Sequence, residues 1–409
     1  MTITFDALLD DRLEQVTLDS TSEHIFTLFS LHKPPDKQNL GYISRTAHTL
    51  PILIRLHASL ISELASKSGQ QPSNLEHHTS LLLSKKRRRA YRHKQLCIPS
   101  EAISVEFEIH QSLELLNSQQ ENSTTGAVLW QITPLFAEWL LTPGTVFHNL
   151  LFGERENGSG LDVIEIGAGT SGILACALSL PLFAHYENDS KIGSYIATDQ
   201  SHILRTLKKN VGSNMPVIQQ MAAHLMHRTK ATPYNSVTLD AHDKNSQDDP
   251  GEWKGHYNVR RMAKQDLHAH HARGSHSSES EKSGPRIEVL ELDWEHAKTD
   301  IKDIHDCLWT SQDEAIVGKK DFDIVVACDT VYNDFLIAPF VNTLKLLAGE
   351  NTHILLGMQL RSHDVQEAFL RSAQSNNLDV WHVFPEHLSE RMQFGFAVYY
   401  LRRSYDCRK

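Results

Sequence analysis

Cysteine is scarce and scattered in this chain. Five cysteines occur among 409 residues, an odd number, and no two of them show Cys-x-x-Cys spacing. Disulfide frameworks use even numbers of cysteines, and structural zinc sites place theirs at short, regular spacings. The cysteine pattern therefore predicts a reducing compartment and no structural zinc site.

The chain also has no long apolar run and no excess of positive charge. The longest apolar stretch, around residues 173–183, is interrupted by Ser179 and Pro181 and is shorter than the about 20 residues that cross a bilayer. The first residues lack the basic region and apolar core of a secretory signal. The formal charge of -10 argues against phosphate-backbone binding over the whole surface. We expect no membrane partner and a cytoplasmic protein, with the nucleus as an alternative.

The most informative positive feature is a buried-type strand that runs into a glycine-rich turn. Residues 161–166 are mostly apolar, and Gly167, Gly169 and Gly172 follow before a second apolar run. The first two glycines permit positive φ and close approach of a ligand, and the third lets the next helix pack on the strand. Such a turn fits dinucleotide enzymes and S-adenosylmethionine methyltransferases alike, and a tight turn without a ligand is the third possibility.

Beyond this turn, apolar runs alternate with helical patterns, as in parallel α/β sheets. Strands are predicted over residues 161–166, 194–198, 286–292, 322–328, 352–358, 379–384 and 396–401, and helices over 128–141, 201–211 and 335–348. No helix of ordinary length separates the last two strands, so we expect them to pair antiparallel. The predicted architecture is an α/β, Rossmann-like sheet of seven strands with a reversed terminal strand.

Two regions lie outside this rhythm. Residues 1–120 form a predicted N-terminal extension, and within the main domain, 121–409, residues 212–285 are polar enough to be a disordered insertion. The extension carries a basic run at 85–94 that suits RNA contact, nuclear import or simply a solvated surface. The insertion carries histidines at 268–276, but no cysteine or carboxylate stands at ligand spacing, so no metal is predicted.

Acidic and aromatic residues stand at the predicted carboxyl ends of the strands, where α/β folds place their ligands. Asp199 follows the second strand and could accept hydrogen bonds from ribose hydroxyls. Glu165 precedes the glycine turn and favours a ligand that carries an ammonium group over a pyrophosphate. Trp294 follows the third strand, and its ring could pack against a purine. The alternative is that it is only a large residue that fills space at the end of the sheet. Asp329 and Tyr332 follow the fourth strand.

Five motifs in this order resemble those of the seven-β-strand protein-lysine methyltransferases with an Asp-x-x-Tyr motif. The motifs are Val128-Leu129-Trp130, Glu165-Ile166-Gly167-Ala168-Gly169, Asp199-Gln200, Leu292-Asp293-Trp294 and Cys328-Asp329-Thr330-Val331-Tyr332. Within the family, the chain looks most like the fungal ribosomal-lysine branch. The resemblance covers roughly residues 128–401 apart from the insertion, whereas the basic run matches no element of the family.

This resemblance implies a cofactor, a substrate and a set of site residues. The cofactor would be S-adenosyl-L-methionine, in a pocket lined by Trp130, Gly167, Ala168, Gly169, Asp199, Trp294 and Cys328. Asp329 and Tyr332 would be catalytic and face the substrate lysine, with Asp329 as a positioner because a carboxylate raises the pKa of a nearby lysine. The implied reaction is monomethylation of a large-subunit (60S) ribosomal protein by a monomeric enzyme.

Three other functions fit parts of the sequence. A small-molecule methyltransferase would use the same cofactor pocket. A catalytically silent scaffold would bind a partner through the N-terminal region and the insertion, although the complete set of cofactor positions argues against it. An NAD dehydrogenase ranks last, because nothing in the chain resembles a hydride-transfer site.

Overall fold

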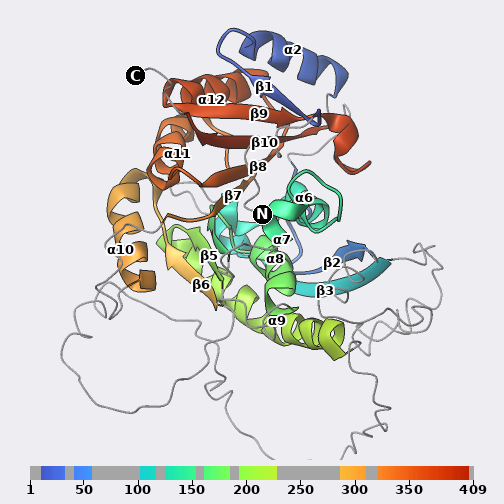
Figure 1. Ribbon diagram of the computed structural model, residues 1–409. Coiled ribbons are helices and arrows are strands. Elements are labelled where there is room, and N and C mark those ends of the chain that lie inside the picture. The colour runs from blue at the N-terminus through green and yellow to red at the C-terminus, as the bar shows by residue number, and fades with distance from the viewer. Residues whose placement is uncertain are drawn as a thin grey trace, which may run out of the picture.

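An eight-stranded sheet runs through the centre of the protein, with helices on both of its faces (Figure 1). The structure is a computed structural model that describes residues 11–32, 41–57, 102–116, 125–152, 161–184, 193–227, 286–309 and 321–404. The basic run at 85–94 and the histidines at 268–276 lie outside these residues. Within the described ranges, no helix is long and apolar enough to cross a membrane.

The strand order of the sheet is β1-β9-β10-β8-β7-β4-β5-β6, and β2 and β3 form a separate two-stranded sheet. The strands are β1 Leu13–Val16, β2 Thr49–His57, β3 Ala102–His110, β4 Asp162–Ile166, β5 Ser194–Asp199, β6 Arg286–Glu291, β7 Ile324–Cys328, β8 His353–Gln359, β9 Leu378–Val383 and β10 Phe396–Arg403. From β6 across to β8 the neighbouring strands are parallel, and β10 is antiparallel to both β8 and β9.

The helices form one layer on each face of the sheet. The α-helices are α2 Thr21–Leu31, α5 Leu113–Leu116, α6 Ile132–Leu140, α7 His148–Phe152, α8 Ile173–Ala184, α9 Ser201–His227, α10 Ala297–Trp309, α11 Asp334–Leu347 and α12 His363–Ser375. Short 3-10 turns are η1 Thr125–Ala127, η4 Trp294–His296 and η5 Pro385–His387. One core cluster joins the sheet to α2, α10, α11 and α12, and the other joins it to α6, α7, α8, α9 and the β2–β3 pair.

Burial on both faces explains why the central strands are mostly apolar. In β4, Val163 packs into one core cluster, while Ile164 and Ile166 pack into the other. Alternate side chains of a strand point to opposite faces, so a strand covered on both sides needs apolar residues at nearly every position. The glycine turn therefore follows a strand that is buried at every position, and it lies at the carboxyl end of that strand.

The order of the strands creates a switch point next to β4. From β4 the chain proceeds outward through β5 to β6, and then returns to the other side of β4 with β7 and β8. In parallel α/β sheets, the crevice at such a point, outside the carboxyl ends of the strands, is where ligands bind. The turns that follow β4 and β7 therefore face each other across this crevice.

The predicted strands and the reversed strand are confirmed. Each of the seven predicted strands appears with its bounds shifted by at most a few residues, and the last two pair antiparallel. Strand β10 is inserted between β8 and β9, which the local pattern did not reveal. The helix expected from residue 128 begins at Ile132, so Pro134 lies in the first turn, where a missing N–H costs little.

Segments from the N-terminal 120 residues are part of the same structure. Strand β1 adds an eighth strand at the sheet edge, antiparallel to β9. The β2–β3 pair is held to α9 by Asn210 and Asn214, whose side-chain oxygens accept bonds of 2.8 and 3.0 Å from the backbone N–H groups of His110 and Glu108. The division of the chain at residue 120 stays a prediction, although segments on both sides share the main sheet.

The expectation of disorder from residue 212 onward is wrong for its first part. Helix α9 continues through Gly212 and Pro216 to His227. Both residues are poor helix formers, but Met215 and Ile218 are buried against the core and Asn214 bonds to β3, so tertiary packing outweighs local propensity. The rest of the expected insertion, 228–285, lies outside the described residues.

We predict that Gly172→Ala destabilises the protein. Gly172 has a φ of +59°, and a Cβ there would lie 2.8 Å from side-chain atoms of both Leu207 and Val211 on α9. The left-handed backbone and the overpacking together should cost about 1 to 3 kcal/mol of unfolding free energy, which denaturant unfolding measures.

Gly212→Ala is the matched control for this prediction. Gly212 lies within α9, and a Cβ there would meet nothing within 4 Å. Alanine should therefore raise the unfolding free energy by about 0.5 to 1 kcal/mol. Equal stability of Gly172→Ala and wild type would contradict the packing argument.

Candidate active site

A cavity of about 540 Å³ opens at the carboxyl ends of the parallel strands. Its wall contains every residue that the sequence assigned to the cofactor or to catalysis, namely Trp130, Gly167, Ala168, Gly169, Asp199, Trp294, Cys328, Asp329 and Tyr332. These residues come from five separate segments of the chain. The fold thus brings the predicted site residues together, while the role of each one stays a prediction.

Neighbouring segments lie so close to the glycine turn that a side chain at Gly167 or Gly169 would crowd them. Gly167 has a φ of +69°, and a Cβ there would lie 2.9 Å from the Thr330 methyl group and 3.2 Å from the Trp294 ring. Gly169 has a φ of +63°, and its Cβ would lie 3.2 Å from the carbonyl oxygen of Gly126. The turn therefore presents bare main chain to the cavity, as a ligand that lies along it requires.

Asp199 is tied to the glycine turn. One of its carboxylate oxygens accepts a 2.8 Å hydrogen bond from the Gly169 N–H, and the other accepts a 2.8 Å bond from the Gln200 N–H. Each oxygen retains a lone pair that can accept a further bond from a hydroxyl group. Burial raises the pKa of Asp199 to about 6, against the lowering effect of the two backbone donors.

Glu165 adds a second acid deeper in the cavity. It is only 2% exposed, and its carboxylate accepts a 2.9 Å bond from the Tyr195 hydroxyl. Burial raises the pKa of Glu165 to about 8, the Tyr195 bond lowers it, and the charge of Asp199 raises it further. Asp293 and Glu295 also line the cavity, and none of its described lining residues is a lysine or arginine. Such a cavity favours a cationic ligand and repels phosphates.

The segment 125–130 closes one side of the cavity and was not predicted to do so beyond Trp130. The Gly126 carbonyl accepts a 2.8 Å bond from the Thr170 N–H, which fixes this segment on the glycine turn. The Thr125 hydroxyl donates a 2.7 Å bond to the Tyr332 hydroxyl, and the Trp130 indole N–H donates to the Thr125 carbonyl at 3.0 Å. No local sequence signal marks Thr125 or Gly126, because their role depends on contacts across the fold.

Asp329 is not open to a lysine in the arrangement described. Its backbone has a φ of +59°, unusual for a residue other than glycine, and its side chain is only 1% exposed. Its two carboxylate oxygens accept bonds of 2.6 and 2.5 Å from the Arg361 guanidinium. In the structure, a bidentate arginine occupies this carboxylate, and the predicted role of Asp329 toward a substrate lysine stays a prediction.

Arg361 is the main site residue that the sequence reasoning missed. It stands just beyond the carboxyl end of β8, and its guanidinium carbon lies 4.9 Å from the centroid of the Trp130 ring. It also donates a 3.0 Å bond to the Gln359 side chain. The strand-end rule that singled out Asp199, Trp294 and Asp329 applies equally to β8 and would have found this residue.

Cys328 forms an apolar part of the wall. It is 9% exposed, and burial raises the pKa of its thiol well above the usual range. The thiol is thus protonated and a poor nucleophile at neutral pH. Cys328 suits a packing role beside a bound ligand.

The parallel sheet with its reversed β10, and the glycine-lined acidic cavity at its switch point, define an S-adenosylmethionine-dependent methyltransferase. The bare turn and the carboxylate of Asp199 suit the nucleoside portion of this cofactor, and the acidic lining suits its ammonium and sulfonium groups. Residues 109–230 and 279–376 match the family described as Lysine methyltransferase. The chain belongs to this family and is an S-adenosylmethionine-dependent protein-lysine methyltransferase.

Curated relatives agree with this assignment. A Lachancea thermotolerans protein named ribosomal lysine N-methyltransferase 5 is 27% identical over 403 residues, which cover 88% of this chain and 90% of the relative. A Zygosaccharomyces rouxii protein of the same name is 30% identical over 284 residues, which cover 65% of this chain and 70% of the relative.

Among solved structures, a glycopeptide N-methyltransferase complexed with sinefungin gives a TM-score of 0.31 at 8% identity, covering 63% of this chain and 84% of that chain.

We predict that cofactor affinity weakens as the pH falls through about 6, because protonation of Asp199 removes its charge and one acceptor oxygen. Affinity is then full above this pH and reduced below it. The loss of one charge-assisted hydrogen bond is worth about 1.5 to 3 kcal/mol, or roughly 10- to 100-fold in Kd. Calorimetric titrations with S-adenosylmethionine on either side of pH 6 measure the effect.

Asp199→Asn is the control for this pH dependence. The amide is neutral at every pH, so the variant should bind the cofactor weakly and lack the step near pH 6. Burial is the main cause that raises the pKa of Glu165 to about 8, well above the range compared, so a step near pH 6 that only wild type shows belongs to Asp199. Identical curves for the variant and wild type would contradict the assignment.

Proposed function

We propose that this enzyme monomethylates a lysine of a large-subunit ribosomal protein. The observation that carries the proposal is the alignment of this chain with relatives named ribosomal lysine N-methyltransferase 5, one of which aligns with 88% of it and another with 65%. Ribosomal proteins are basic, so the net charge of -10 favours their approach. We place the reaction in the cytoplasm, with the nucleus as the alternative, and expect the enzyme to act as a monomer.

The basic run at 85–94 is proposed to assist substrate docking. A ribosomal protein that is already assembled exposes RNA beside its target lysine, and a cluster of lysines and arginines binds phosphates. This contact is a second, separable element of the proposal, because a free ribosomal protein would need no such cluster.

The protein contributes mainly orientation to the reaction. S-adenosylmethionine supplies a methyl group on a sulfonium, and the transfer is an in-line displacement by a neutral amine. The enzyme must therefore hold the lysine in line, let it lose a proton and exclude competing water. Tyr332 is suited to line the lysine channel, since its hydroxyl lies in the cavity wall and is held by Thr125.

Asp329 acts together with Arg361 in this proposal. A lysine ammonium that enters the cavity competes with the guanidinium for the same carboxylate, so Arg361 releases Asp329 and keeps its contacts with Trp130 and Gln359 as the lysine binds. The contacts of Arg361 with these two residues support this exchange, because they can hold the guanidinium after it leaves Asp329. Asp329 then positions the amine, and its proton leaves through water.

We predict that Asp329→Asn abolishes lysine methylation and leaves cofactor affinity nearly unchanged. The amide keeps the shape of the side chain but removes the charge that holds an ammonium. A fall of at least about 100-fold in kcat/KM is expected, equivalent to about 2.7 kcal/mol of transition-state stabilisation. Initial rates with a protein substrate and calorimetry with S-adenosylmethionine separate the two effects.

Asp364→Asn is the control for this substitution. Asp364 forms an exposed ion pair with His363 outside the cavity, and its loss should change neither rate nor affinity. Normal turnover by Asp329→Asn would refute the role proposed for Asp329. A parallel loss of cofactor binding would show instead that the Asp329–Arg361 pair is needed only to build the pocket.

The substrate proposal is tested with labelled S-adenosylmethionine and a fungal extract. We expect the label in one large-subunit ribosomal protein, and mass spectrometry of that band should show a single methyl group on one lysine. The Asp329→Asn protein serves as the blank. Label in other proteins would contradict the ribosomal assignment, and label only in small molecules would favour the alternative of a small-molecule methyltransferase.

A further inference from the structure

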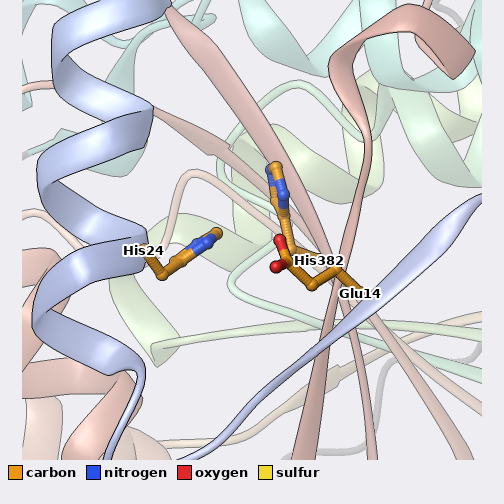
Figure 2. Close-up of side chains that lie close together, drawn as sticks. All are labelled: Glu14, His24 and His382. Atoms are coloured by element: carbon orange, nitrogen blue, oxygen red, sulfur yellow. The ribbon is translucent and has the colours of Figure 1, made fainter.

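Two histidines and a glutamate converge at the edge of the sheet where β1 pairs with β9, on the far side of β8 and β10 from the switch point (Figure 2). Glu14 comes from β1, His24 from α2 and His382 from β9. One possible ligand atom from each side chain lies within 4.8 Å of the other two. The residues come from opposite ends of the chain, so the cluster exists only in the folded protein.

The strand register and a hydrogen-bond network hold this cluster in place. Glu14 is directly opposite His382 in the β1–β9 pair, and His382 is directly opposite Tyr399 in the β9–β10 pair. A ring nitrogen of His24 lies 3.0 Å from the Tyr399 hydroxyl, which also accepts a 3.0 Å bond from the Gln366 amide. The rings of His24 and His382 are 4.7 Å apart. A hydrogen-bonded ring nitrogen of this kind is the usual second-shell support of a metal-binding histidine.

His382 carries the observation that points to a ligand. Its side chain is buried, with only 3% of the residue exposed, and its Nε2 has no hydrogen-bond partner among the residues that the structure describes. Buried polar atoms are nearly always paired, so an orphaned imidazole nitrogen beside a second histidine and a carboxylate indicates a missing partner.

We propose that Glu14, His24 and His382 bind a Zn²⁺ ion. Two imidazole nitrogens and one carboxylate oxygen are a zinc donor set, whereas Ca²⁺ and Mg²⁺ prefer oxygen alone. Zinc bonds of about 2.1 Å in a tetrahedron place ligand atoms roughly 3.4 Å apart, so small side-chain rotations close the present spacing. Because Glu14 is exposed, water can complete the coordination from the solvent side.

Zinc at this position would fasten the N-terminal segment to the sheet. Strand β1 is short and lies at the sheet edge, and α2 packs over α12 and the same edge. An ion that joins β1, α2 and β9 adds a cross-link at an edge strand, which pairs with a neighbour on one side only. The role is structural and differs from the expectation drawn from the cysteines, because no cysteine takes part. It is independent of the methyl transfer proposed for the cavity.

Zinc binding is tested on the full-length protein after dialysis against a chelator. The experiment compares wild type with Glu14→Gln and His24→Gln, and uses His363→Gln, an exposed histidine elsewhere, as the matched control. Because the chain has 25 histidines, including those at 268–276, the readout is the difference between proteins. Wild type and the control should each bind one equivalent of Zn²⁺ more than either site variant, in competition with a chromophoric chelator.

Two further measurements distinguish specific coordination by these three residues from non-specific binding of Zn²⁺ elsewhere on the protein. Co²⁺ in place of Zn²⁺ should give the intense visible absorption of a four-coordinate ion with wild type, and this band should be lost in both site variants. Zn²⁺ should raise the thermal unfolding midpoint of wild type and of His363→Gln by several degrees and leave that of the site variants unchanged. The exposed Glu14 makes misfolding of Glu14→Gln a poor explanation of any loss. If either site variant binds the same equivalents with the affinity of wild type, the three-ligand site is wrong.

Discussion

The close approach of two backbone segments at the glycine turn is the constraint on which the active site depends. Gly169 has a left-handed backbone, a Cβ there would lie only 3.2 Å from the Gly126 carbonyl oxygen, and the Thr170 N–H donates to that same carbonyl. This contact fastens the segment 125–130 over the carboxyl end of β4. Through it, Thr125 reaches Tyr332 and Trp130 reaches Arg361, so one backbone contact assembles both the cofactor wall and the substrate wall.

The electrostatics of the cavity follow from how each acid is buried. Glu165 is buried and Asp199 is half-buried, each accepts hydrogen bonds from neutral donors, and desolvation raises the pKa of both. Asp329, in contrast, is paired with Arg361 through two hydrogen bonds. Neither of these two acids is occupied by an arginine, whereas the third is. In the proposed mechanism, this difference separates cofactor binding from lysine binding, because a lysine reaches Asp329 only by replacing the arginine.

Long-range contacts also make the N-terminal segments part of the enzyme. Strand β1 pairs with β9, the β2–β3 pair packs on α9, and the buried Asn210 and Asn214 satisfy the backbone of β3. The proposed zinc ligands belong to the same theme, because Glu14 and His24 meet His382 only after the sheet has formed. Burying Asn210, Asn214 or His382 costs free energy unless each side chain has a partner, and the partners come from distant parts of the chain.

The sequence by itself determined the strands and the glycine turn, because both depend on local rules, and local rules together with the family resemblance placed part of the cavity wall. Strand periodicity located β4 to β10, and the rule that ligands bind at strand ends selected Asp199, Trp294 and Asp329. The tertiary structure alone decided that Arg361 pairs with Asp329, that β10 lies between β8 and β9, that α9 runs past Gly212, and that Glu14, His24 and His382 meet. These features depend on which distant segments share an edge or a face, and packing between such segments leaves no trace in local spacing.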